Sequence, residues 1–153
     1  MPVDAGSTAD EGTCLEVRQA ARRITQFFDE FLAPVGLRST QFSILAKLRR
    51  LGPMMISVLA GHMVMDRTTL GRNILPLKRE GLISIVKGSS DGRSKELSLT
   101  EDGAARLRVA VEGWTLAQAR FEAVFGGKRT MDLHTLLHAV TTSDFGTAPA
   151  GRP

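Results

Sequence analysis

The chain has 153 residues, of which 42% are hydrophobic and 24% are charged, a composition typical of a globular protein with one hydrophobic core. It contains no uninterrupted apolar run of the length that a membrane-spanning helix needs, and its N-terminus lacks the pattern of a secretory signal. The single cysteine excludes an internal disulfide framework, so we expect a cytoplasmic protein with no membrane partner.

The net charge of +4 is distributed unevenly along the sequence. Residues 38–95 contain eleven Lys and Arg but only three Asp and Glu, whereas the remainder of the chain is acidic overall. Because neutralisation of phosphates by basic side chains supplies most non-specific affinity for nucleic acids, this asymmetry favours an anionic partner. A solvent-exposed surface with no partner would give the same number of basic residues. The local sequence patterns must therefore distinguish a nucleic-acid-binding surface from an ordinary one.

Helical patterns dominate the first half of the chain. A first amphipathic helix is predicted over about 13–33, and its apolar face comprises Leu15, Val17, Ala21, Ile24, Phe28, Phe31 and Leu32. Ser39 or Thr40 offers an N-cap for a second helix with Phe42, Leu45 and Leu48 inward, and Ser57 offers one for a short third helix.

A fourth helix is expected to begin after Asp66, an N-cap residue, and to end at Gly81. Pro76 lies inside it and predicts a kink or a change in curvature. The pattern changes after Gly81, where the β-forming run LISIVK, the turn cluster SSDGRS and the alternating run KELSLT predict a two-stranded hairpin.

Two further helices are predicted after the hairpin. Thr100 begins the fifth, which carries Leu107, Val111, Trp114, Phe121 and Val124 and breaks at Gly126 and Gly127. A sixth runs from about Thr130 to Thr142 with Met131, Leu133, Leu136, Leu137 and Val140. The terminal helices carry more large apolar residues than so small a core requires, which favours a dimer.

The third and fourth helices match a helix-turn-helix, in which the second helix reads the major groove of DNA. Its hydrophilic residues lie early in the helix, whereas Leu70, Ile74 and Leu77 form an apolar face opposite. Arginine can bind guanine through two hydrogen bonds, asparagine can pair with adenine, and threonine methyls can meet thymine methyls. The residues expected to read bases are Arg67, Thr68, Thr69, Arg72 and Asn73.

The hairpin tip gives independent support for a nucleic-acid partner. It gathers Lys87, Arg93 and Lys95 around glycines that allow close approach to phosphate, and an arginine there could enter a narrow minor groove. Asp91 could hold the Arg93 guanidinium or cap the turn. The spacing of a nucleotide-binding loop is absent.

The stretch MDRTTLGRNILPLKREGLI, followed by a D-G-R wing and LSLTEDG, resembles the MarR family of transcriptional regulators, and the resemblance covers residues 14 to about 142. It implies a mostly α-helical winged helix-turn-helix protein with a small β-hairpin wing, which binds double-stranded DNA as a homodimer. Each recognition helix would read half of a pseudo-palindrome, and the half-sites would lie roughly 34 Å apart.

The resemblance also implies a domain organisation and further contacts. A single domain would span 13–142, with the winged helix-turn-helix at about 38–100 and dimerisation helices at about 13–33 and 101–142; the tails 1–12 and 143–153 are expected to be disordered. The resemblance places Arg93 in the minor groove and adds Ser39, Thr40, Ser57 and Lys95 as contacts to the DNA backbone.

The sequence leaves three kinds of effector site to be considered. Relatives commonly sense aromatic or phenolic compounds, and Arg18, Phe28, Phe31 and Trp114 could line such a pocket, although aromatic residues at helical spacing also form ordinary core. Cys14 near the start of the first helix could act as a thiol sensor, although the chain has no tyrosine to surround it. The spacing of His134 and His138 suits a metal pair but lacks further ligands, so neither a metal nor a cofactor is expected.

Three classes of function remain to be compared. No catalytic motif supports an enzyme. A protein-interaction relative that has lost DNA binding is the alternative within the fold, but basic residues remain at both groove-facing elements. The sequence therefore predicts a sequence-specific transcriptional regulator, a homodimeric repressor released by a ligand or by oxidation of Cys14.

Overall fold

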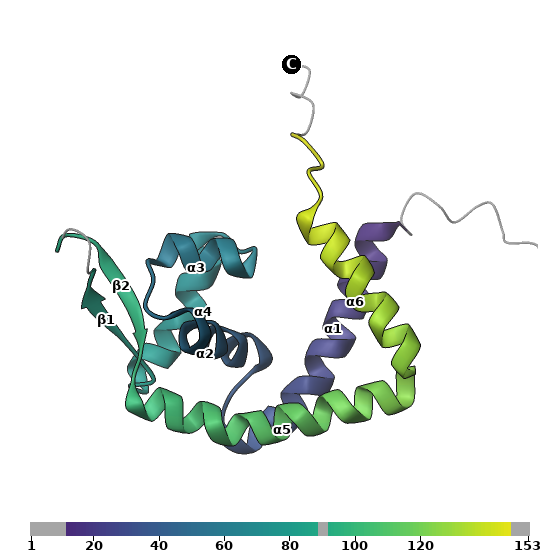
Figure 1. Ribbon diagram of the computed structural model, residues 1–153, viewed down its shortest axis with the longest axis horizontal. Coiled ribbons are helices and arrows are strands. Elements are labelled where there is room, and N and C mark those ends of the chain that lie inside the picture. Colours follow the sequence, from purple (N-terminus) through teal and green to yellow (C-terminus); the bar gives the residue numbers. More distant parts are fainter. Residues whose placement is uncertain (1–11, 89–91, 148–153) are drawn as a thin grey trace, which may run out of the picture. The chain divides into compact units, whose positions relative to one another are not determined.

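The computed structural model describes residues 12–88 and 92–147. Helices make up most of the described chain, and the strands form one two-stranded antiparallel sheet, which confirms the expected fold class (Figure 1). The elements are, in order, α1 (Thr13–Leu32), the short 3₁₀ helix η1 (Ala33–Val35), α2 (Ser39–Leu51), α3 (Ile56–Met63), α4 (Arg67–Arg79), β1 (Ile83–Lys87), β2 (Lys95–Leu99), α5 (Glu101–Phe125) and α6 (Gly127–Thr142).

Tertiary contacts divide the chain into two compact units, residues 1–117 and residues 118–153, with the boundary inside α5. The first unit contains α1 to α4, the hairpin and most of α5; the second contains the end of α5 and α6. The single domain expected over 13–142 stays a prediction, and the tails expected to be disordered lie largely outside the described residues. None of the described helices is long and apolar enough to cross a membrane.

The hydrophobic core of the first unit lies between the helix-turn-helix and the start of α5. The expected inward residues of α2 are buried, and so is the predicted apolar face of α4, because Leu70 and Leu77 are fully buried and Ile74 is nearly so. On α1 only Phe28 and Leu32 are buried, whereas Val17 is 47% exposed. The first turns of α1 therefore present apolar surface that the described chain does not cover.

Glycines let α5 approach its neighbours closely. A Cβ on Gly103 would collide with the carbonyl oxygen of Leu82, and one on Gly113 would lie 2.6 Å from the carbonyl oxygen of Phe31. Both distances are below any that real Cβ atoms adopt, so α5 packs directly on the backbone of the α4–β1 turn and of α1. Between these points, Leu107 and Ala110 fill the core.

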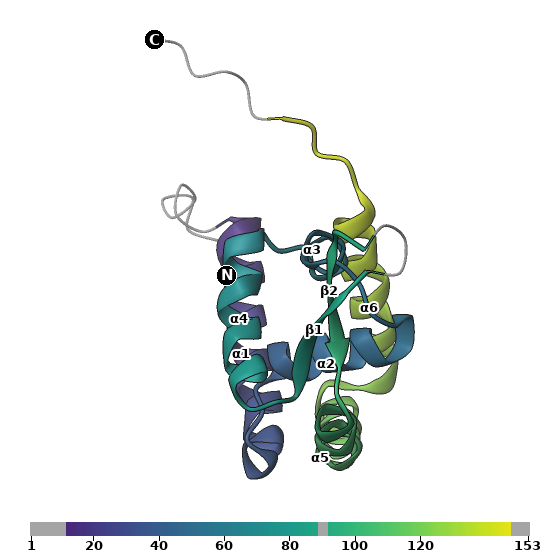
Figure 2. The same cartoon turned by 90° about the vertical axis from the view of Figure 1, so that its left-hand side faces the viewer.

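The hairpin pairs β1 with β2 in the register Ile83 to Leu99 and Lys87 to Lys95. The hairpin extends away from the start of α5, so its tip lies at the far end (Figure 2). An additional bridge, which the sequence did not predict, joins Met54 in the α2–α3 connection to Leu97: the Met54 N–H donates to the Leu97 carbonyl at 3.1 Å, and the reverse bond is 2.8 Å. This bridge fixes the hairpin against the helix-turn-helix.

Several helix boundaries differ from those expected. The N-cap of α2 is Arg38, whose N–H donates to Gln41 Oε1 at 3.0 Å, so neither Ser39 nor Thr40 caps this helix. Ser57 does not cap α3, because the chain turns into that helix one residue before it and Met55 is the N-cap. In both cases the expected hydroxyl lies inside the first turn, where it no longer faces the free N–H groups.

The predicted boundaries of the remaining helices agree more closely with the structure. Thr100 caps α5, because its Oγ1 accepts a hydrogen bond from the Gly103 N–H at 3.0 Å. Helix α6 begins at Gly127, three residues before the predicted start. Helix α4 continues through Pro76; the kink expected there stays a prediction.

Candidate nucleic-acid interface

The first turn of α4 is built around Asp66, which caps the helix as predicted. Its Oδ1 accepts the Thr69 N–H at 2.8 Å and its Oδ2 accepts the Thr69 hydroxyl at 2.7 Å. These hydrogen bonds, the backbone one first, lower the pKa of the Asp66 carboxyl below its ordinary value because they favour the charged form. The cap therefore fixes the start of α4 and also occupies the Thr69 side chain.

The exposed face of α4 separates the five expected base readers into two groups. Arg67, Thr68 and Arg72 project into solvent, and within the described residues the Arg72 side chain makes no hydrogen bond. Asn73 is half-buried, and its Nδ2 donates to the Thr69 carbonyl at 2.9 Å. The first three side chains are thus available to a ligand, whereas Thr69 and Asn73 already hydrogen-bond within the helix.

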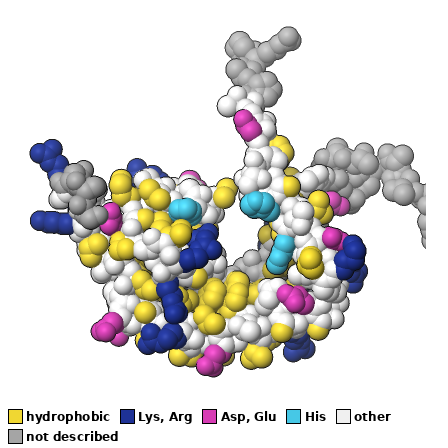
Figure 3. Space-filling view, in the orientation of Figure 1, with side chains coloured by type: hydrophobic (Ala, Val, Ile, Leu, Met, Phe, Trp, Pro, Cys, Tyr) yellow, Lys and Arg dark blue, Asp and Glu magenta, His cyan; other side chains and the backbone are white. Residues whose placement is uncertain are grey.

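The tip of the hairpin concentrates positive charge. Lys87 and Lys95 face each other directly across the two strands, and both are exposed, as is Arg93. Figure 3 shows Lys and Arg side chains gathered at this free end of the hairpin. Like charges directly opposite in a sheet are destabilising unless an anion neutralises them. The register therefore creates a site that favours an anionic partner.

A close backbone contact shapes the neck of the hairpin. The Gly88 N–H donates to the Ser94 carbonyl at 2.7 Å, and Gly88 is buried, with no room for a Cβ beside the Ser94 hydroxyl. The glycine therefore leaves the Ser94 hydroxyl undisplaced at the neck, in addition to allowing the approach to phosphate that the sequence suggested. Asp91, expected to hold Arg93 or to cap the turn, lies outside the described residues.

A concave surface of about 460 Å³ lies between α3, α4 and the hairpin. It brings together Ser57 from α3, Arg67 from α4 and Lys95 from β2, three residues on different elements that were all expected to bind DNA. Lys78 adds a third cation, against one carboxylate, that of Glu96, and the rest of the described lining is mostly apolar, with Ile74, Leu75, Ile85 and Leu97 among it. We call this surface, defined by Ser57, Arg67, Lys78, Lys95 and Glu96, the basic groove.

Ser39 and Thr40 lie apart from the basic groove, at the start of α2. Both are half-buried, and the Ser39 N–H donates to Asp29 Oδ1 at 2.7 Å. Asp29 therefore already occupies one backbone donor at the N-terminus of α2 that a phosphate could otherwise use. The sequence contained a signal for this contact, an aspartate on the last turns of the preceding helix, but its partner could not be identified without the tertiary fold.

The residues expected to line an effector pocket are mostly engaged in aromatic packing. Trp114 stacks on Phe42 with ring centroids 4.3 Å apart, and it contacts Phe28 at 4.5 Å. Phe31 packs against Phe27 on the same helix. Arg18 is exposed and precedes Phe28 by ten residues, which corresponds to about 15 Å along a helix. The structure therefore joins Phe28 to Trp114 but does not bring Arg18 to them.

The remaining candidate residues lie on the surface. Cys14 is exposed in the first turn of α1. His134 and His138 are exposed on α6, one turn apart. No cluster of three or more His, Cys, Asp or Glu that could hold a metal ion occurs within residues 12–88 and 92–147.

Comparison with known proteins gives concordant matches. Residues 37–95 match the sequence profile of the MarR family. The chain is 33% identical over 87 residues to the uncharacterized HTH-type transcriptional regulator YwoH of Bacillus subtilis, a match that covers 57% of this chain and 63% of YwoH. The chain thus spans slightly less than two thirds of the curated relatives that it matches.

Solved structures extend the similarity over most of the chain. The M. tuberculosis transcriptional regulator MosR is 35% identical with a TM-score of 0.73, and the match covers 88% of this chain and 98% of MosR. The structure of MosR in complex with DNA is 37% identical with a TM-score of 0.72, covering 85% of this chain and 96% of that protein.

Proposed function

Because this chain belongs to the MarR family, whose fold is that of transcriptional regulators and not of enzymes, we propose that it binds double-stranded DNA sequence-specifically and acts as a homodimeric repressor. The observation that carries this proposal is the basic groove beside the exposed face of α4, in which Ser57, Arg67 and Lys95 converge from three elements. Convergence of cations and a hydroxyl on one concave surface suits the phosphates that border a major groove.

The division of roles within the site follows from exposure. Arg67, Thr68 and Arg72 project from the first turns of α4, where a recognition helix meets base edges. Lys87 and Lys95, opposed at the end of the hairpin, would contact the phosphate backbone, and Arg93 beyond them would enter the minor groove. The DNA-bound structure of the similar protein MosR supports a DNA ligand for this surface.

The second unit supports a second copy of the chain as partner. On α6, the residues Leu133, Leu136, Leu137 and Val140 fall on one face of the helix at spacings of three and four. Leu136 is 65% exposed and Val140 is 50% exposed within the single chain. A helix face of this kind is stable in water when another apolar surface covers it, and a symmetric dimer supplies one.

Release from DNA would require an effector that binds one conformation better than the other. A small aromatic or phenolic compound remains the proposed effector. The exposure of Cys14 supports the alternative, in which oxidation of the thiol to a sulfenic acid or an intersubunit disulfide changes DNA affinity.

The decisive experiment is selection of bound duplexes from a random DNA pool by the purified protein, at two salt concentrations and with Cys14 reduced or oxidised. An enriched inverted repeat with half-sites about one helical turn apart is the expected result. The double variant Arg67→Ala/Lys95→Ala should lose this enrichment, whereas Arg108→Ala, an exposed arginine on α5, should keep it. Retention of only salt-sensitive, sequence-independent binding by the wild-type protein would refute the proposal.

A further inference from the structure

The C-terminal end of α4 is joined to the start of α5 by a compact set of contacts. The Thr100 hydroxyl donates to the Gly81 carbonyl at 2.6 Å, and the Thr100 N–H donates to the Leu82 carbonyl at 3.1 Å. Gly103 lies against the same Leu82 carbonyl with no room for a side chain. These contacts fix the turn that follows α4, but all of them act on Gly81 and Leu82, after the helix has ended.

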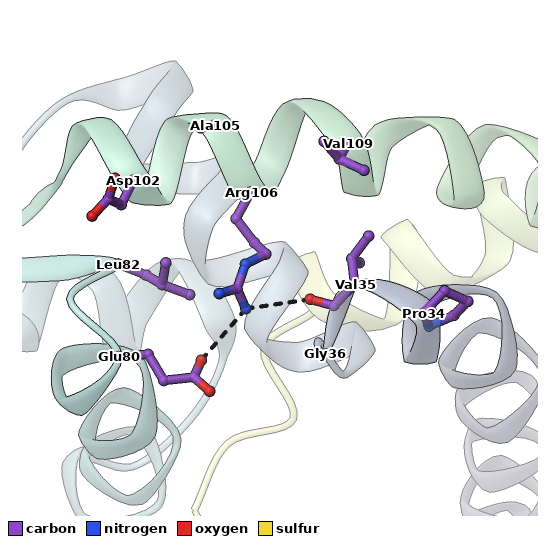
Figure 4. Close-up of a pocket in the computed structure, with 9 residues that line it drawn as sticks. All are labelled: Pro34, Val35, Gly36, Glu80, Leu82, Asp102, Ala105, Arg106 and Val109. Atoms are coloured by element: carbon purple, nitrogen blue, oxygen red, sulfur yellow. Dashed lines mark hydrogen bonds and ion pairs between the residues drawn. The ribbon is translucent and has the colours of Figure 1, made fainter.

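One turn further along α5, Arg106 reaches the end of α4 itself. Its Nη1 lies 3.6 Å from Oε2 of Glu80, the C-cap residue of α4, and donates to the Val35 carbonyl in η1 at 3.3 Å. Figure 4 shows the guanidinium projecting from α5 between Glu80 and Val35, with both contacts dashed. One side chain therefore connects α5, the end of α4 and the loop after α1.

Little else fills the space that this side chain crosses. It is a cavity of about 650 Å³ whose described lining is Pro34, Val35, Gly36, Glu80, Leu82, Asp102, Ala105, Arg106 and Val109. Asp102 also lines the cavity, but no ion pair joins it to Arg106 within the described residues. Across this depression, Arg106 contacts both Glu80 at the end of α4 and Val35 in η1.

The Arg106–Glu80 ion pair is too exposed to stabilise the fold appreciably, but it can still position α4. The side chains of Arg106 and Glu80 are 34% and 52% exposed, and ion pairs at such exposure contribute little to the free energy of unfolding. An ion pair to one element and a hydrogen bond to another can nevertheless restrict the direction of a helix whose opposite end is fixed. At the start of α4 that fixed point is Leu70, which is fully buried in the hydrophobic core.

We propose that Arg106 is a positioning residue, which sets the orientation of α4 for DNA by tying Glu80 to α5 and to Val35. This inference rests on the proposed function, since orientation matters only if α4 reads DNA. A recognition helix held at both ends can discriminate the spacing between half-sites, because a misplaced half-site then requires the protein or the DNA to deform. Loss of Arg106 should relax this discrimination before it affects folding.

The test compares Arg106→Gln with the wild-type protein on the selected inverted repeat and on repeats with one base pair added to or removed from the centre. The variant should bind the optimal repeat roughly five- to tenfold more weakly, and the spacing penalty should shrink, since contacting residues in one network couple measurably. The dependence of affinity on salt should stay unchanged because the phosphate contacts are intact. Arg108→Gln, an exposed arginine on the same helix, should behave as wild type.

Two further variants separate positioning from simple damage. Glu80→Gln removes the same ion pair from the other side, and combining it with Arg106→Gln should add no further loss of spacing discrimination. Arg106→Lys keeps the charge and should restore part of the discrimination. If Arg106→Gln fails to fold, the Glu80→Gln protein still reports on the ion pair.

A readout that needs no DNA distinguishes failure of this inference from failure of the proposed function. Hydrogen exchange at the amides of Glu80, Gly81 and Leu82 should be faster in Arg106→Gln than in the wild-type protein, with amides in α2 unchanged. If the wild-type protein selects an inverted repeat while the variant keeps both its exchange rates and its spacing penalty, the positioning role is refuted alone. If the wild-type protein selects no sequence, the proposed function fails, and with it the role of Arg106 in reading DNA.

Discussion

The side chains on α4 divide by what they already contact. Arg72 is exposed and makes no hydrogen bond within the described residues, whereas Thr69 is bound to Asp66 and Asn73 donates to the Thr69 carbonyl. An occupied side chain must give up one partner to gain another, so its contact with a base contributes less net free energy. Arg67, Thr68 and Arg72 are therefore the strongest candidates for reading sequence.

Replacement of Arg72 by alanine tests this ranking. If Arg72 binds a guanine through two hydrogen bonds, Arg72→Ala should weaken operator binding by about 1–3 kcal/mol and relax base preference at one position of each half-site. Fluorescence anisotropy with single-base variants of the operator measures both effects. Arg108→Ala removes the same charge elsewhere and should leave base preference unchanged; equal profiles for the two variants would contradict the assignment.

The Asp66 cap predicts a dependence of stability on pH. Hydrogen bonds from Thr69 lower the pKa of Asp66 in the folded state, so between the lowered value and the unfolded value the folded chain binds fewer protons. The stabilising contribution is therefore complete above the unfolded pKa and is lost as the pH falls through the lowered folded value. Asp66→Ala should lower the Tm at pH 7, and the difference from wild type should shrink below about pH 4. A difference that is constant between pH 7 and pH 3 would contradict this cause.

At the scale of elements, α2 and α4 buried the predicted apolar faces, whereas α1 and α5 did so only in part. Of the large apolar residues that the sequence placed on α5, Leu107 is buried, whereas Val111 is 42% exposed and Val124 is 79% exposed. The other buried positions of α5 are Gly103, Ala110 and Ala117. Small residues face inward because α5 approaches other backbones closely, and hydrophobic periodicity alone gives no weight to glycine or alanine.

Two glycine substitutions test the close approach of α5. Gly103→Ala should lower the free energy of unfolding by about 1–3 kcal/mol, because the new methyl group would overlap the Leu82 carbonyl and force α5 away. Gly71→Ala is the matched control: it lies inside α4 with open space around the new Cβ and should raise stability by roughly 0.5–1 kcal/mol. Urea denaturation measures both changes, and changes of the same sign would contradict the packing described.

At the scale of the whole molecule, the apolar face of α6 predicts self-association. Val140→Asp places a charge on that face and should shift the protein from dimer to monomer in sedimentation velocity, because burying an unpaired carboxylate is costly. Val58→Asp alters an equally apolar residue on α3, 47% exposed against 50% for Val140, and should leave the dimer intact. A dimer that survives Val140→Asp would place the interface elsewhere.

The sequence by itself determined the order of the elements, the Asp66 and Thr100 caps, the buried face of α4 and the hairpin. These features depend on residues close together in the chain, whose spacing reports directly on local geometry. It also showed that the basic residues are concentrated in the central segment, because the distribution of charge along the chain can be read without knowing the fold.

Only the tertiary structure decided which distant residues meet. It joined Ser57, Arg67 and Lys95 in one groove, paired Met54 with Leu97, and set Arg106 between Glu80 and Val35. It also brought Phe28 into a tilted ring contact with Trp114 and left Arg18 outside it. Contacts of this kind depend on how elements pack, and a single sequence carries no pairwise signal for them, since many arrangements bury the same apolar faces.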